Sequence, residues 1–303
     1  MKKKLVSICL GTYNQKDYIN ECLDSISTQT YPNIEVIISD DCSKDETYKK
    51  IKLFFLKNKN NFKVKIFKQR TNIGISKNFN FLYKQAKGEY IIFFGGDDIM
   101  VNNKIEKQVK ILTTNPKVSF VYSNCKWFFN SNKKICFNHF NFFNRYPKSI
   151  KNILSDLTIP SPTMMINRNY IDHQPFNERL KYYGDFLLII KLWKKKNPIY
   201  IDETLVFYRK HKNSILLSHK SNNERLLLIS LIKKEFKDNS LYQKEIAKYK
   251  YIYTYHQILN GRFSILNNLK DFFLFILQMT RSVRGVFRLF IIIIYFIKSI
   301  KRT

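Results

Sequence analysis

Short apolar runs alternate with amphipathic stretches over roughly the first 125 residues of the chain. The runs are rich in Ile, Val and Phe, as buried β-strands are, and the stretches between them repeat apolar residues at helical spacing. This alternation predicts an α/β fold with a mostly parallel sheet flanked by helices, in which functional groups gather at the carboxyl ends of the strands. The predicted strands are Leu5–Leu10, Ile34–Ser39, Val64–Phe67, Tyr90–Phe94 and Val118–Tyr122. The predicted helices cover Tyr18–Ile26, a stretch from Glu46, Ser76–Ala86 and Asn103–Leu112.

The pattern is less regular in the second half of the chain. Residues 126–160 are rich in Phe and Asn without a clean period, which predicts an irregular insertion. A catalytic-type α/β domain is expected over residues 1–219, and a helical extension rich in Leu, Ile and Tyr over residues 220–303. The elements expected to complete the first domain are a strand over Thr163–Ile166, a helix over Asp185–Lys195 and a strand over Ile199–Tyr208.

The last apolar stretch, Leu289–Ile297, is nine residues long, well below the ~20 that span a bilayer. A basic and aromatic end of this kind predicts a helix that lies on an anionic membrane surface. A helix packed on the domain, or an oligomer contact, is the alternative. The first apolar run ends at Gly11, too early for a signal peptide. Cations flank or interrupt the last stretch at Arg281, Arg284, Arg288, Lys298, Lys301 and Arg302.

The chain is strongly basic, with 53 Lys and Arg against 23 Asp and Glu and a net charge of +30. Such an excess suggests an anionic partner, which can be nucleic acid, acidic lipid or a phosphorylated substrate. A coding bias toward lysine is the alternative explanation. The five cysteines form no CxxC pair and no zinc spacing, which predicts free thiols in a reducing compartment.

Two pairs of carboxylates, Asp40-Asp41 and Asp97-Asp98, each follow directly after a predicted strand. In a parallel sheet the two pairs converge on one edge. Adjacent acids are costly unless a cation or hydrogen-bond donors neutralise them. Mn²⁺ or Mg²⁺ holding a diphosphate meets that need, because both ions prefer hard oxygen ligands. A solvated acidic turn before a helix is the alternative for each pair taken alone.

Four motifs occur in an order and spacing that resemble the family-2 glycosyltransferases, over roughly residues 4–215. The resemblance implies a GT-A fold, in which a nucleotide-binding αβ sheet holds a nucleotide-sugar donor and a sugar is transferred with inversion. The motifs are the opening Val6–Asn14 with Tyr18–Tyr31, then Ile34–Thr47, Asn72–Asn78 and Gly88–Ile91.

The resemblance also implies contacts with the donor. Tyr13 is expected to stack near the nucleobase, and Asp40 and Asp41 to bind the donor, with Asp41 on the edge of the base. Lys77 stands where the family commonly has an arginine, and is expected to touch the nucleotide.

The turn Gly95–Asp98 corresponds to the family's acidic motif for metal and ribose. Asp97 is expected to bind both donor and metal, and Asp98 to bind metal. The family commonly has a further aspartate before this pair, whereas this chain has Gly95-Gly96. The loss of one carboxylate puts the strength of metal binding in question.

Three later residues resemble the family's catalytic and closing segments. Asp185 is expected to be the general base that takes the proton of the acceptor hydroxyl, although Gly184 replaces the family's Glu; a helix cap is its alternative role. Arg209 is expected to pair with a donor phosphate, and His211 to bind the metal or the diphosphate. A surface histidine after a strand is the alternative for His211.

The sequence therefore predicts an inverting hexosyl- or N-acetylhexosaminyltransferase that uses a divalent metal and a nucleotide sugar, which we expect to be UDP-linked. We expect a lipid-linked oligosaccharide acceptor from bacterial surface-glycan synthesis, and a peripheral location on the cytoplasmic face of the membrane. The Gln-x-x-Arg-Trp motif of processive synthases is absent, so one sugar per encounter is expected. Two alternatives stay open: a nucleotide-binding family member without catalysis, and a nucleic-acid-binding protein. The second lacks any recognised nucleic-acid-binding motif.

Overall fold

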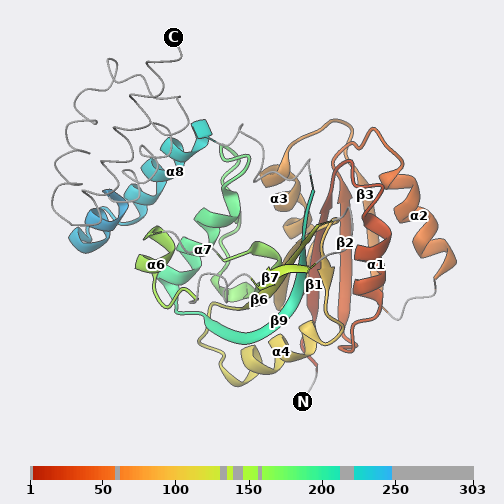
Figure 1. Ribbon diagram of the computed structural model, residues 1–303, viewed down its shortest axis with the longest axis horizontal. Coiled ribbons are helices and arrows are strands. Elements are labelled where there is room, and N and C mark those ends of the chain that lie inside the picture. The colour runs from red at the N-terminus through yellow and green to blue at the C-terminus, as the bar shows by residue number, and fades with distance from the viewer. Residues whose placement is uncertain are drawn as a thin grey trace, which may run out of the picture. The chain divides into compact units, whose positions relative to one another are not determined.

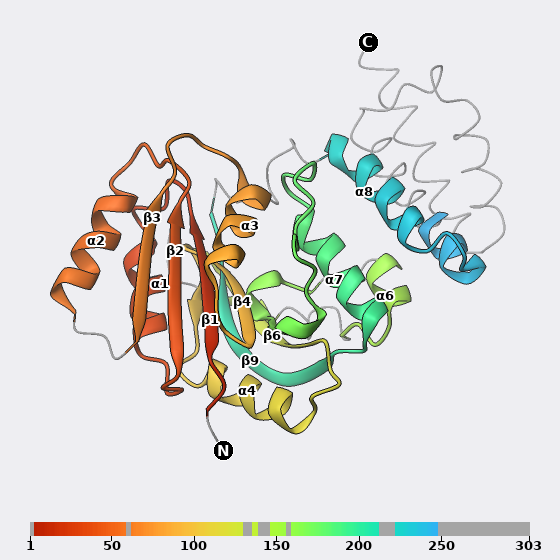
Figure 2. The ribbon, with the colours of Figure 1, turned by 180° about the vertical axis from the view of Figure 1, so that it is seen from behind.

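The computed structural model describes residues 3–58, 62–129, 135–138, 146–155, 159–211 and 222–247. Contacts divide the chain into two units, Met1–Glu235 and Phe236–Thr303. All of the labelled helices and strands belong to the first unit (Figures 1 and 2). The predicted domain boundary after residue 219, and the predicted membrane-binding segment near the C-terminus, lie outside the described residues.

One sheet forms the centre of the first unit, with the strand order β3-β2-β1-β4-β8-β6-β9-β5 and with β7 paired to β6. The strands on the parallel side are β1 (Val6–Thr12), β2 (Ile34–Asp40), β3 (Lys63–Lys68) and β4 (Tyr90–Gly95). The others are β5 (Ile99–Met100), β6 (Phe120–Phe129), β7 (Ile135–Asn138), β8 (Met165–Asn167) and β9 (Ile199–Lys210).

The helices are α1 (Ile19–Ser27), α2 (Thr47–Lys57), α3 (Ile75–Gln85), α4 (Lys104–Thr114), α6 (Ile150–Ser155), α7 (Gly184–Lys195) and α8 (Asn222–Glu235). Two short 3₁₀ helices, η1 (Ser161–Thr163) and η2 (Arg168–Tyr170), flank β8. The helices in the described part of the chain are all too short or too polar to cross a bilayer.

The register of β1 with its two neighbours brings three strand ends to one edge. Thr12 pairs with Asp40 of β2, and Gly11 pairs with Gly95 of β4, so these strands end level with one another. Residues at alternate positions of β1, such as Ile8 and Leu10, pack into a core with α1, α2 and α4. The opposite face of β1 contacts α3, where a Cβ on Gly11 would lie 3.1 Å from the Phe79 ring.

The other strands of the sheet bring β9 to that same edge. β8 pairs antiparallel with both β4 and β6, while β6 and β9 run parallel to each other. β5 pairs antiparallel with β9, and Met100 lies opposite Val206. Because β5 follows the turn after β4, this pairing brings the end of β9 against that turn.

The predicted α/β fold is confirmed, and β1 to β4 are parallel, but the irregular insertion over residues 126–160 is wrong. β6 continues to Phe129, and β7 and α6 follow within that range. The predicted strand stops at Tyr122 because Ser123 and Asn124, which are polar although buried, interrupt the apolar run as the residues of a turn would.

α8 is held to the start of α7 by charged and polar contacts. The Glu224 carboxylate accepts hydrogen bonds from the backbone N–H groups of Lys181 (2.8 Å) and Tyr182 (2.9 Å). The Arg225 guanidinium donates to the Tyr183 hydroxyl at 2.7 Å. These bonds fix the segment that leads into α7.

The turn before β4 depends on a glycine. A Cβ on Gly88 would lie 2.5 Å from Ser7 Oγ, 2.6 Å from Ser7 N and 2.9 Å from Leu5 O. We expect Gly88→Ala to lower the free energy of unfolding by about 1–3 kcal/mol, because two of these neighbours are backbone atoms that cannot move aside. Urea denaturation measures this, with Lys84→Ala on the exposed side of α3 as control. Equal midpoints for the two variants would contradict the packing described here.

Candidate active site

The loops at the carboxyl edge of β1, β2 and β4 are hydrogen-bonded to one another. The backbone N–H of Asp41 donates to Thr12 O at 2.8 Å, and that of Gly96 donates to Gly11 O at 3.2 Å. The loop after β1 is also bound to the loop after β2, because Asn14 accepts from the Lys44 N–H at 2.9 Å. The three loops therefore form one connected surface.

Tyr13 stands on this surface with 41% of its area exposed. Its neighbour Asn14 adopts a left-handed φ of 51° and donates its N–H to Ser43 Oγ at 2.9 Å. The backbone beside Tyr13 is thus fixed while the ring stays accessible, as stacking on a nucleobase requires.

Asp40 and Asp41 shape the edge in different ways. Asp40 is fully buried; its Oδ1 accepts from the Ser43 N–H at 2.9 Å and its Oδ2 from the Ser43 hydroxyl. These contacts close the tight turn around Cys42, whose φ is 63°. We assign Asp40 to this turn, and its predicted direct contact with a donor stays a prediction.

Asp41 connects β2 to the segment before α3. Its two carboxylate oxygens accept from the N–H groups of Ile73 (2.8 Å) and Gly74 (2.9 Å). Burial raises the pKa of Asp41, and these two hydrogen bonds oppose that rise. Lys77 follows in the first turn of α3 with its side chain exposed. Asp41, which binds the segment before α3, and Lys77, which follows that segment, are the two residues predicted to contact the donor here.

The two glycines of the acidic turn are sterically required. A Cβ on Gly96 would lie 2.6 Å from Gln15 Oε1 and 2.8 Å from Thr12 Cγ2. A Cβ on Gly95 would lie 2.8 Å from Asp97 Oδ1. The atom near position 95 is the end of a flexible side chain, so Gly96 is the more tightly constrained of the two glycines.

Asp97 and His211 come together although they are far apart in sequence. The Asp97 Oδ2 and His211 Nε2 atoms are 3.1 Å apart, and the Tyr18 ring lies 4.7 Å from the imidazole, centroid to centroid. The side chains are 23% and 9% exposed, so a small ligand can reach Asp97. The carboxylate suits Mn²⁺ or Mg²⁺, and the imidazole nitrogen beside it favours a transition metal such as Mn²⁺ over Mg²⁺. Within the described residues no group of three or more acidic, His or Cys side chains meets at one point.

Asp98 has a different environment from its neighbour. It is 3% exposed, and its Oδ1 accepts from the backbone N–H of Arg209 at 2.9 Å. Burial, and then the negative charge of Asp97, raise the pKa of Asp98 well above its usual value. This carboxylate binds the turn to β9, so the structure favours Asp97 over Asp98 as the metal ligand.

The structure corrects the prediction that Arg209 pairs with a phosphate. The Arg209 side chain is 0% exposed, and its Nε donates to Asp97 O at 2.7 Å. One Nη donates to Glu21 Oε2 at 2.8 Å, and the guanidinium lies between the rings of Tyr18 and Phe128, 5.0 and 4.5 Å from their centroids. Arg209 is therefore a buried support for the acidic turn.

Asp185 lies in the first turn of α7, where Phe186 N–H donates to its Oδ1 at 2.8 Å. It is inside the helix and does not cap it; the N-cap is Tyr183. Burial raises the pKa of Asp185 to about 6, which the bond from Phe186 opposes. A carboxylate with this pKa is ionised at neutral pH and has the strength that a general base needs.

The pKa of Tyr208 in β9 is affected both by Asp185 and by the acidic turn. Burial raises the pKa of the Tyr208 hydroxyl well above its usual value, and the negative charges of Asp98, Asp97 and Asp185 raise it further. The charges of the acidic turn and of Asp185 thus act on the same tyrosine.

The start of α7 is in turn packed on α3, because a Cβ on Gly184 would lie 2.7 Å from Ser76 Oγ and 3.1 Å from Phe176 Cδ1. A glutamate at position 184, as in the family, has no room here.

Sequence reasoning missed three residues of this region. Glu21 was not singled out, because its partner Arg209 is 188 positions away. Tyr18 was noted only for its helical spacing. Lys210 is 6% exposed, with its Nζ 4.0 Å from the Trp127 ring centroid and 4.6 Å from that of Tyr208. Burial lowers the pKa of Lys210, and nothing in the sequence around it signalled an aromatic enclosure.

The exposed Tyr13 ring follows β1, and the paired Asp97 and His211 follow β4 and β9, at the carboxyl ends of the strands, where open α/β sheets bind their ligands. Residues 7–174 match the family model described as "Glycosyl transferase family 2". The chain therefore belongs to glycosyl transferase family 2.

Relatives with assigned names share part of their length with this chain. It is 40% identical over 124 residues to the Escherichia coli UDP-Glc:alpha-D-GlcNAc-diphosphoundecaprenol beta-1,3-glucosyltransferase WfaP, covering 40% of this chain and 46% of the relative. It is 27% identical over 197 residues to WfgD of E. coli, which carries the same activity name, covering 65% and 73%. The chain spans 39%, 45% and 46% of the length of three of the curated relatives it matches.

Solved structures confirm the fold. S. aureus TarS 1-349 in complex with UDP-GlcNAc superposes with a TM-score of 0.63 at 23% identity, covering 88% of this chain and 76% of TarS. The mannosyltransferase PcManGT from Pyrobaculum calidifontis, in complex with GDP-Man and Mn²⁺, gives 0.61 at 18% identity, covering 79% and 66%. The fold of this chain is GT-A.

The pairing of Glu21 with Arg209 is testable through stability. Glu21→Gln removes the carboxylate that pairs with the Arg209 guanidinium, so we expect the free energy of unfolding to fall by about 1–2 kcal/mol, an effect reduced by the 39% exposure of Glu21. Asp24→Asn, an exposed change of the same type on the same helix, should stay within about 0.5 kcal/mol of wild type. Chemical denaturation followed by circular dichroism measures both. If the two variants unfold alike, the buried pair does not support the turn.

Proposed function

We propose that this chain is an inverting glycosyltransferase that moves one hexose or N-acetylhexosamine from a UDP-sugar to a hydroxyl of a lipid-linked oligosaccharide. The pairing of Asp97 with His211, whose Oδ2 and Nε2 atoms are 3.1 Å apart, is the observation that carries the proposal. We place the enzyme in bacterial surface-glycan synthesis, on the cytoplasmic face of the membrane. The names of WfaP and WfgD, which specify a GlcNAc-diphosphoundecaprenol acceptor, and the TarS complex with UDP-GlcNAc support this choice.

In this proposal the donor lies over the edge of β1, β2 and β4. The exposed Tyr13 ring stacks on the base, Asp41 and the segment it binds contact the base edge, and Lys77 contacts the nucleotide. Asp97 and His211 would hold Mn²⁺ or Mg²⁺, whose charge would neutralise that of the diphosphate leaving group. Two protein ligands suffice, because such ions usually take their other ligands from substrate phosphates and water.

Asp185 is the proposed general base. The acceptor hydroxyl oxygen forms a bond to the anomeric carbon while the bond from that carbon to the diphosphate breaks. The hydroxyl proton passes to the Asp185 carboxylate and is later released to water, and UDP leaves with the electron pair. Attack opposite the leaving group converts an α-linked donor into a β-linked product.

The glycines that suggested a non-catalytic relative have another explanation. Gly95, Gly96 and Gly184 each occupy a position where a Cβ would lie within 3.0 Å of another atom. Their presence follows from packing, and the Asp–His pair and Asp185 are retained beside them. Nothing in the described site favours nucleic acid as a ligand over a nucleotide sugar.

Asp185→Asn tests the base. We expect kcat to fall by about 10²–10⁴-fold with UDP-sugar affinity unchanged, because the amide keeps the shape but cannot accept the proton. In the wild type, kcat/KM should fall as the pH drops below about 6, the value to which burial raises the pKa of Asp185. Mass-spectrometric detection of transfer, and calorimetry for donor binding, measure these quantities.

Stability gives an independent readout of the same group. Because its pKa is raised on folding, the protonated Asp185 favours the folded state, and that contribution is lost as the pH rises through about 6. Asp185→Asn should therefore melt above wild type at pH ~8 and near it only at pH ~3.5, below the ordinary pKa of 3.8. Asp172→Asn, in a residue that is ion-paired with Lys195, is the control and should keep turnover. Wild-type turnover in Asp185→Asn would assign the base to another residue.

The Asp97–His211 pair can be tested without turnover. Titration calorimetry of UDP into the wild type should show tighter binding with Mn²⁺ than with EDTA. Asp97→Asn and His211→Ala should each lose most of that difference, because each removes one of the two protein ligands. His173→Ala, at an exposed histidine, is the control and should retain the difference. Equal wild-type affinity in Mn²⁺ and EDTA would refute metal-assisted binding.

A further inference from the structure

The outer face of α2 exposes apolar side chains in a way that the donor site does not require. Leu56 is 78% exposed, the highest value for a large apolar side chain among the described residues, and Leu53 is 42% exposed. The two leucines are three positions apart, so they lie on one side of the helix. The opposite side of α2 buries Ile51 and Phe54 in the core.

Lysines surround the two leucines. Lys49, Lys52 and Lys57 are exposed, and lie one helical turn from a leucine or beside one. The helix itself contains no acidic residue, and only Glu46, just before it, contacts Lys49, at 3.7 Å. We call Lys49, Lys52, Leu53, Leu56 and Lys57 the α2 face.

The basic surface continues onto the neighbouring edge strand. Lys52 and Lys68 of β3 both lie over the Tyr48 ring, at 6.0 and 5.1 Å from its centroid. β3 is the last strand on this side of the sheet, and α2 lies beside it at the outer side of the unit (Figures 1 and 2).

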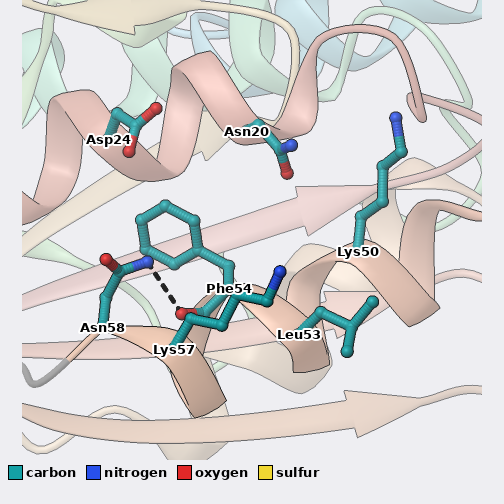
Figure 3. A pocket seen from close by; sticks show the side chains of 7 residues that line it. All are labelled: Asn20, Asp24, Lys50, Leu53, Phe54, Lys57 and Asn58. Carbon is teal, nitrogen blue, oxygen red and sulfur yellow. Dashed lines mark hydrogen bonds between the residues drawn. The ribbon is translucent and has the colours of Figure 1, made fainter.

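A shallow groove between α1 and α2 borders the α2 face (Figure 3). Leu53 and Lys57 line it together with Asp24 of α1, whereas Leu56 does not. The carboxylate of Asp24 makes the groove a poor site for a bound anion. The α2 face is therefore the part of this region that suits an extended anionic surface.

We propose that the α2 face binds an anionic lipid bilayer. Apolar side chains bracketed by lysines match the boundary between acyl chains and acidic headgroups, where leucines enter the apolar side and lysines stay with the phosphates. This contact belongs to the α/β unit itself, and it is separate in sequence from the C-terminal stretch expected to bind membranes. It does not depend on the proposed transfer reaction.

Two other occupants fit less well. Two exposed leucines offer much less area than the ~1,200 Å² that a stable protein interface buries. A second copy of the chain in a two-fold dimer would place the lysines of both α2 faces against one another, which like-charge repulsion disfavours.

The experiment uses the full chain and vesicles of phosphatidylglycerol or of phosphatidylcholine alone. Leu56→Trp should be quenched by brominated phosphatidylglycerol, because the side chain enters the acyl boundary. Leu226→Trp, at a position of α8 that is 52% exposed, should not be quenched. The double variant Leu53→Ser/Leu56→Ser should reduce flotation with phosphatidylglycerol by at least about threefold. Leu226→Ser should leave flotation unchanged.

Charge is tested by Lys49→Gln/Lys52→Gln, which should weaken flotation most at low salt. The control pair Lys110→Gln/Lys117→Gln changes two exposed lysines elsewhere and should have a smaller effect. An unquenched Leu56→Trp protein, equal binding to neutral vesicles, or no vesicle binding would each overturn the proposal. A dimer in lipid-free light scattering that the leucine variant converts to a monomer would do so too, and would assign the α2 face to self-association.

Discussion

The buried charge of Arg209 is the constraint on which the edge of the sheet depends. A guanidinium with no solvent exposure must find its partners inside the protein, or its desolvation is not compensated. Those partners are Glu21 of α1 and the carbonyl of Asp97, 188 and 112 positions earlier in the chain. One side chain thus holds α1, the acidic turn and β9 together, and His211 reaches Asp97 because it follows two residues after Arg209.

The same arrangement separates the roles of two adjacent acids. The backbone carbonyl of Asp97 accepts a hydrogen bond from Arg209, whereas its carboxylate lies beside His211 and is partly exposed. Asp98 turns its carboxylate inward to the backbone N–H of Arg209, and burial raises its pKa well above the usual range. Asp97 and Asp98 look equivalent in the sequence, but Asp97 is a candidate metal ligand and Asp98 is a structural group. The two carboxylates need not both be ionised at once.

The sequence allowed most of the strands and their order of appearance to be predicted, because both depend on local periodicity. That Asp41, Asp97 and Asp185 serve one site stays a prediction. The sequence did not show β6 beyond Tyr122, because the polar Ser123 and Asn124, both buried, interrupt the apolar run as the residues of a turn would. It also misassigned Arg209. The sequence around an arginine is the same whether its side chain binds a phosphate or a glutamate of another helix. Only the 0% exposure of the Arg209 side chain distinguishes the two.

Steric requirements explain the departures from the family pattern better than loss of function does. Ser76 bonds to the Leu180 carbonyl and leaves no room for a Cβ at Gly184, so the start of α7 lies close against α3. That contact joins the segment held by Asp41, which is expected to meet the nucleotide, to the helix turn that carries Asp185. A glutamate at position 184 would force these elements apart. The glycine therefore preserves the relation between the donor side and the proposed base, and burial in this close-packed region raises the pKa of Asp185 to about 6.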